Sequence, residues 1–95
     1  MEASLKKNPL IDQLCDALCN IESREEAKSF LRDLCTISEI KSMSERLEVA
    51  KQVQEGISYR QIYKNTGVST ATITRVAHWL HHGEGGYLAL LGQMH

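Results

Sequence analysis

The chain has 95 residues, a formal net charge of −1, and 42% hydrophobic and 24% charged residues. This length fits a single domain over residues 1–95, and the composition excludes a disordered chain and a membrane protein. No apolar run approaches the roughly 18 residues of a membrane span, and residues 1–7 are polar, so we expect a cytoplasmic location. Because so short a chain buries only about 60% of its unfolded surface, we also expect a partner subunit.

The charge is unevenly distributed along the chain. Residues 1–50 hold ten acidic residues against seven Lys and Arg, a net of −3, whereas residues 51–95 hold two against four, a net of +2. No acidic residue lies between Gly56 and Gly83, a stretch that contains three Lys or Arg and three His. This part of the chain is suited to face phosphates.

The cysteines are Cys15, Cys19 and Cys35, an odd and sparse set that indicates reduced thiols and not a disulfide framework. Cys15 and Cys19 are four residues apart and could together ligate a metal. No second pair with structural-zinc spacing is present, however, so we favour packing in a core and expect no metal site.

Apolar residues recur at helical spacing along almost the whole chain, and no segment alternates like a half-buried strand. We therefore expect an all-α fold of about six helices. The first helix follows Asn8-Pro9, and its double apolar stripe predicts a helix that is deeply packed. The stripe consists of Leu10, Ile11, Leu14, Cys15, Leu18 and Cys19.

Two more helices are expected between the first and Gly56. Ser23 has the character of an N-cap for one of them, and Thr36 and Glu39 have capping-box spacing for the other. Each continues with apolar residues at steps of three or four, so each has one face to bury.

Residues 58–82 predict two shorter helices joined by a tight turn. Ser58 and Gln61 have capping-box spacing, and Gly67 is placed to end the first helix in the left-handed conformation. Ser69 begins the second helix, which should end before Gly83. Its buried stripe should consist of Ile73, Val76, Ala77 and Leu80, and a last short helix is expected within residues 86–95.

This helix–turn–helix pattern predicts binding to double-stranded DNA. The second helix begins with Ser69, Thr70, Ala71 and Thr72, which offer hydroxyls, a methyl group and helix-start amides to bases and phosphates. Arg60 and Lys64 on the first helix are candidates for guanine or phosphate contacts. Tyr63 occupies a position where a small residue is usual, so its side chain must point outward.

A simple helical hairpin, with Ser and Thr acting only as caps, would give the same local pattern. The corresponding functional alternative is a helical protein-interaction module that does not bind DNA. Binding that weakens steeply with salt would distinguish the DNA-binding protein from the module.

Two runs of residues resemble the DNA-reading part of the bacterial tryptophan repressor family: Tyr59–Asn65 (YRQIYKN) and Ala71–Arg75 (ATITR). The resemblance covers roughly residues 30–92. More narrowly, the chain resembles the uncharacterised Trp-repressor-related proteins of Gram-positive bacteria. It implies a tryptophan-repressor-like intertwined homodimer in which residues 10–56 are the dimerisation helices. It also implies a transcriptional regulator that acts as a repressor, and adds Thr74 to the predicted DNA contacts.

The resemblance also implies ligand positions. Thr36, Arg46 and Arg75 match residues that surround the bound tryptophan in the family, with Arg75 at the position that holds its carboxylate. The chain departs from the family at Val76, where the family has glycine, and at Trp79, where it has a small hydroxyl residue. We hypothesise that Val76 or Trp79 fills the corepressor space, so an aromatic amino acid corepressor is doubtful and no other cofactor is expected. A lone tryptophan on a helix also packs simply in a core.

His78 and His82 are four residues apart and could bind a transition metal. The glutamate that accompanies a zinc hydrolase pair is missing, so we favour a solvent-facing or phosphate-facing role. No nucleophile with its base and no Gly-rich phosphate loop is present, and Gly85-Gly86 is interpreted as a hinge. We therefore expect no enzyme activity.

Overall fold

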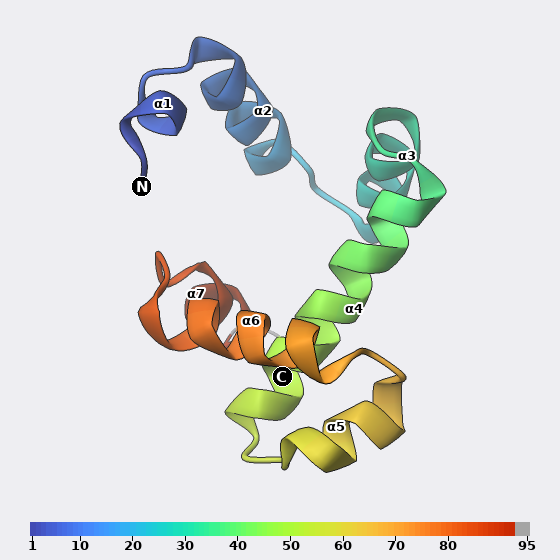
Figure 1. Ribbon diagram of the computed structural model, residues 1–95. Helices are drawn as coiled ribbons and strands as arrows, with labels where there is room; N and C mark the ends of the chain where they lie inside the picture. The colour runs from blue at the N-terminus through green and yellow to red at the C-terminus, as the bar shows by residue number, and fades with distance from the viewer. Residues whose placement is uncertain (93–95) are drawn as a thin grey trace. The chain divides into compact units, whose positions relative to one another are not determined.

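The computed structural model describes residues 1–92, which form seven α-helices and no strand (Figure 1). The predicted all-α class is confirmed. One more helix is present than expected, because α1 is a single turn of four residues and leaves no periodic pattern in the sequence. No helix within residues 1–92 is both long and apolar enough to cross a membrane. The helices are α1 (Ala3–Lys6), α2 (Pro9–Cys19), α3 (Arg24–Leu34), α4 (Ile37–Gln54), α5 (Tyr59–Thr66), α6 (Thr70–His82) and α7 (Gly86–Leu91).

The chain divides into two compact units, Met1–Ile37 and Ser38 onward. In the first unit, helices α1, α2 and α3 contain no buried residue. Leu10 on α2 is 73% exposed, and Cys15 and Cys19 are exposed as well. The expectations of a deeply packed first helix and of core cysteines are therefore wrong for the single chain. An apolar stripe predicts that a helix needs a covering surface, but not that the same chain supplies it.

Polar side chains cap the starts of four helices. Each side chain accepts the backbone N–H of a residue two or three positions later, at 2.9–3.2 Å. Such a bond satisfies one of the N–H groups that a helix start leaves without a partner, and each is worth about 1 kcal/mol. The pairs are Asn8–Leu10 in α2, Ser23–Glu26 in α3, Ser58–Gln61 in α5 and Ser69–Thr72 in α6.

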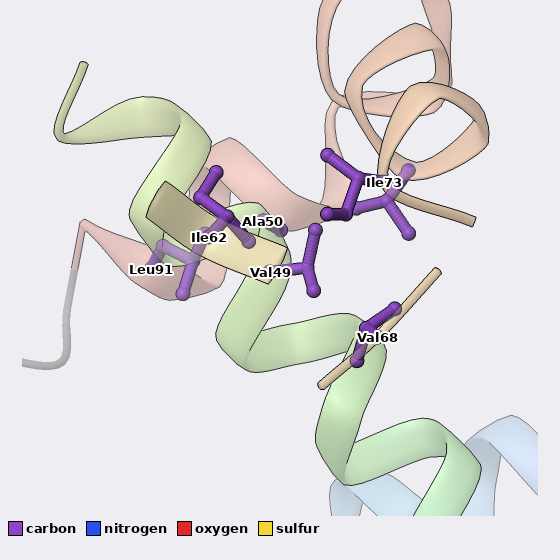
Figure 2. Packing of buried hydrophobic residues seen from close by; sticks show 7 residues of the cluster. Val49, Ala50, Ile62, Val68, Ile73 and Leu91 are labelled. Carbon is purple, nitrogen blue, oxygen red and sulfur yellow. The ribbon is translucent and has the colours of Figure 1, made fainter. Parts of the chain in front are cut away.

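The core of the second unit forms around the C-terminal half of α4 (Figure 2). Val49 and Ala50 of α4 are fully buried, and so are Ile62 of α5 and Ile73 of α6. Val68, in the turn between α5 and α6, belongs to the same cluster. Burial of each large aliphatic side chain contributes about 1.5–3 kcal/mol, so this cluster holds both helices on α4.

Helix α7 packs against α6 and adds the buried Leu91 to the core. The expected C-terminal segment 86–95 extends beyond the described residues. Gly83 ends α6 where a side chain has no room, because a Cβ there would collide with the carbonyl oxygen of Trp79. Gly85 then adopts a left-handed φ of 82°, which glycine tolerates without strain. The two glycines thus set the tight connection from α6 to α7.

Replacing Ile62 with alanine should lower the free energy of unfolding by about 2–5 kcal/mol, because the change empties a fully buried site. The adjacent Tyr63 is 52% exposed and provides the matched control. Tyr63→Ala should change the free energy of unfolding by no more than about 0.5 kcal/mol. Urea denaturation followed by circular dichroism measures both variants, and equal losses would contradict a core built on Ile62.

Candidate functional site

Helices α5 and α6 pack against each other and are joined by Gly67, Val68 and Ser69. Gly67 has a left-handed φ of 75°, and its N–H donates to the carbonyl oxygen of Tyr63 at 2.8 Å. Val68 is buried beneath the turn, and Tyr63 faces solvent as predicted. The turn therefore reverses the chain within three residues and sets where α6 begins.

An amide network braces α5 on α4. Asn65 Nδ2 donates to Oε1 of Gln52 at 3.0 Å, and Asn65 Oδ1 accepts from Nε2 of Gln61 at 2.8 Å. Gln52 also donates to a carboxylate oxygen of Glu48 at 3.4 Å. Gln61 thus directs its side chain along α5 to Asn65. Because 13 residues separate Gln52 from Asn65, no local pattern in the sequence marks this contact.

Six of the seven predicted DNA contacts have exposed side chains. Two cations lie one turn apart on α5, and the others are small, uncharged residues at the N-cap and in the first two turns of α6. The surface therefore combines cations with small polar groups. The six are Arg60, Lys64, Ser69, Thr70, Ala71 and Thr74.

The seventh predicted contact, Thr72, is half-buried and pairs with the N-cap residue. Ser69 Oγ donates to Thr72 Oγ1 at 3.0 Å and accepts the backbone N–H of Thr72 at 3.2 Å. Both hydroxyls are therefore engaged in forming the start of α6. Thr70, Ala71 and Thr74 make no such bond and present their side chains outward.

Two of the three predicted ligand residues, Arg46 and Arg75, line one open hollow of about 420 Å³. We call it the Arg46–Arg75 hollow. The sequence did not point to Ser42 and Glu45, which α4 adds to its wall. Thr36 is exposed and belongs to the first unit. The complete lining is Ser42, Glu45, Arg46, Gly67, Val68, Ser69, Thr72 and Arg75.

Val76 and Trp79 do not line the Arg46–Arg75 hollow. Val76 is 2% exposed and lies in the core, as the stripe with Ile73 predicts. Trp79 is 50% exposed and borders a second hollow, of about 410 Å³, which we call the Trp79 hollow. Its lining is mostly apolar and consists of Leu47, Trp79, Gly83, Glu84, Gly86, Tyr87 and Leu90.

Residues 10–95 match the family described as Trp repressor protein. The chain belongs to this family. It is 46% identical over 77 residues to the uncharacterized protein YerC of Bacillus subtilis, an alignment that covers 81% of this chain and 74% of YerC. A TrpR-like protein from Eubacterium eligens is 41% identical, with a TM-score of 0.88 over 93% of this chain and 91% of that one. A candidate Trp repressor from Staphylococcus aureus is also 41% identical, with a TM-score of 0.91 over 99% and 94%.

These matches confirm the resemblance that the two runs in α5 and α6 carry. They also extend it, because the family match begins at residue 10, within α2. The Trp repressor family consists of regulators and not of enzymes, so the chain is a TrpR-like regulator. The shared all-helical fold places α5 and α6 in the same architecture as in both solved relatives.

Gly67→Ala should lower the free energy of unfolding by about 1–2 kcal/mol, because alanine is strained in the left-handed region. No atom lies within 4 Å of an added Cβ, so the loss is conformational and not steric. Gly86→Ala is the matched control, since Gly86 has equal space but no positive φ. In thermal unfolding, Gly86→Ala should leave the melting temperature unchanged or raise it slightly. A similar loss in both variants would contradict this role of Gly67.

Proposed function

We propose that this chain is a sequence-specific DNA-binding transcriptional regulator, a repressor, that acts as a homodimer through a helix-turn-helix at residues 58–82. The observation that carries the proposal is the exposed, uncharged start of α6 beside the cations of α5. Membership of the Trp repressor family supports it. We place the protein in the cytoplasm, where bacterial DNA is found.

The charge of the α5–α6 pair suits contact with phosphates. Residues 57–82 contain no Asp or Glu. Arg60 has the reach and the planar fork for guanine or a phosphate, and Lys64 supplies a second cation one turn later. The first N–H groups of an α-helix have no partner inside the helix, so the start of α6 adds donors for a phosphate oxygen.

The side chains at the start of α6 suit close approach to base edges. Thr70 and Thr74 can donate or accept a hydrogen bond, and the methyl group of Ala71 can meet a thymine methyl. Their small size lets the helix lie deep in the major groove. Ser69 and Thr72 hold this end of the helix in shape through their mutual hydrogen bond.

A homodimer would cover apolar surface that the single chain leaves exposed. Helices α2 and α3 bury no residue, although they carry regular apolar stripes. Exposed apolar surface of this extent is unusual in a stable monomer and indicates a partner. Two copies related by a twofold axis would present two reading helices to successive major grooves. The exposed residues include Leu10, Leu14, Leu18 and Leu34.

The Arg46–Arg75 hollow is the proposed place for an effector. Thr36, the third ligand residue that the family resemblance implies, belongs to the first unit and is not among the lining residues. Val68 is its only aliphatic wall residue, and Glu45 adds a carboxylate. Such a lining offers little apolar surface to an indole ring. We therefore propose that tryptophan is not the corepressor, and that the protein binds DNA without a ligand or with a more polar effector.

Arg60→Ala should weaken binding to a duplex that the wild-type protein selects from a random-sequence pool. The loss should be roughly 1–3 kcal/mol if Arg60 contacts a base, and the wild-type affinity should fall steeply with added salt. Lys28→Ala, which removes an exposed cation from α3, is the control and should leave the affinity unchanged. Fluorescence anisotropy at several salt concentrations measures all three proteins.

The alternative is a helical protein-interaction module that keeps the repressor fold. The Trp79 hollow favours it, because a half-exposed tryptophan in an apolar setting is typical of protein interfaces. A module of this kind would select no duplex from the pool. It would also show neither a salt-dependent affinity nor an effect of Arg60→Ala.

Calorimetric titration with free tryptophan should show no saturable binding near micromolar concentrations. Val76→Ala serves as the comparison, because the sequence predicts that Val76 fills the corepressor space whereas the structure places it in the core, outside the lining of the hollow. Binding to this variant alone would assign the exclusion to Val76, whereas binding to neither would assign it to the polar lining. Saturable micromolar binding to the wild-type protein would contradict the proposal.

A further inference from the structure

Helix α6 ends in a turn rich in histidine that the proposed DNA contacts do not use. His78, His81 and His82 are all exposed. The rings of His78 and His82 lie 5.2 Å apart, centroid to centroid, and are tilted by 43°. We propose that His78 and His82 form a two-histidine binding site for a divalent transition-metal ion. The site does not depend on whether α6 reads DNA.

The separation of the two rings fits shared coordination of one ion. Zinc holds an imidazole nitrogen at about 2.0–2.1 Å. The centre of each ring lies roughly 1 Å behind that nitrogen, so two imidazoles on one tetrahedral ion have centroids about 5 Å apart. The observed 5.2 Å matches this separation. Rotation of the two rings about their side-chain torsions would turn a nitrogen of each toward the ion.

The backbone that carries the pair is already held in place. Residues four apart on an α-helix stand on the same face, one turn above the other. Ala77, directly before His78, and Leu80, between the two histidines, are buried in the core. The core therefore fixes the spacing before any ion arrives, and binding has to order only the two imidazole side chains.

The position at the end of the helix also favours a cation. The C-terminal end of an α-helix carries a partial negative charge of about half an electron. His82 is the last residue of α6, and the residues between it and His78 include no Asp, Glu, Lys or Arg. The nearest cation on the same helix is Arg75, three residues before His78. The end of the helix thus offsets part of the charge that the ion brings.

The chemistry of the pair selects the class of ion. Neutral imidazole is a ligand for Zn²⁺, Ni²⁺ and Cu²⁺, and of these three ions Cu²⁺ binds most strongly. Within residues 1–92, no group of three His, Cys, Asp or Glu residues could hold a metal ion. The ion would therefore keep water in its remaining positions, where a further ligand could exchange.

His81 provides the matched control. It is exposed on the same turn, but its ring lies 6.4 Å from that of His82 in an edge-on arrangement that does not suit shared coordination. Cys15 and Cys19 are also exposed and four residues apart on α2. Their thiols can bind zinc as well, so the measurement must report on individual histidines.

The test is a titration of the ¹⁵N-labelled full chain with zinc chloride at pH 7.5, followed through the histidine ring signals by NMR. The ring signals of His78 and His82 should move together, while those of His81 stay in place. His78→Gln and His82→Gln should each lower the zinc affinity of the site by roughly tenfold or more, because each leaves a single ligand. His81→Gln should leave it unchanged.

Thermal unfolding in the presence of EDTA shows whether each variant is folded, and all three substitutions are at exposed positions. The proposal is overturned if zinc leaves the ring signals of His78 and His82 unmoved. It is also overturned if His81→Gln weakens zinc binding as much as the other two variants. The same holds if the backbone amide signals of Cys15 and Cys19 respond to zinc while no histidine ring signal does.

Discussion

The packing of Ile62 and Ile73 on Val49 and Ala50 is the contact on which the second unit depends. Caps and glycines determine where α5 and α6 begin and end, but they do not determine the direction in which either helix points. The direction of each helix is set by its fully buried isoleucine, which packs on Val49 and Ala50 of α4. Val68, in the turn between the helices, is buried in the same cluster. Since protein interiors are close-packed, the angle between the two helices can change only if this cluster is rebuilt.

The parts of the fold that could be predicted are those whose signals are local. A capping serine acts on an N–H three residues away, and Gly67 acts on its own φ, so Ser58, Gly67 and Ser69 mark their structures within a few residues. The buried stripe of α6 is equally local, because it depends only on helical periodicity. That stripe also excludes Trp79, which explains why a tryptophan beside a buried helix face is half-exposed.

What could not be predicted depends on surfaces brought together from distant parts of the chain. The periodicity of α2 is as regular as that of α6, yet one helix buries its stripe in this chain and the other does not. The Gln52–Asn65 bond and the position of Glu45 beside Arg46 and Arg75 arise only once α5 and α6 have packed on α4. Val76 and Trp79, the two candidates for filling the corepressor space, lie three residues apart on α6. Val76 belongs to the core, whereas Trp79 borders the Trp79 hollow.

The walls of the Arg46–Arg75 hollow come from α4 and from the start of α6, two helices that also pack together in the core. Ser42, Glu45 and Arg46 lie on α4, whereas Ser69, Thr72 and Arg75 lie at the start of α6. A molecule bound across this gap would tie the leading turn of α6 to α4 and reduce the range of angles over which that turn fluctuates. If α6 reads DNA as proposed, a helix already restrained in this way would lose less conformational entropy on entering a groove. Binding in the hollow would then strengthen binding to DNA without altering a contact to it.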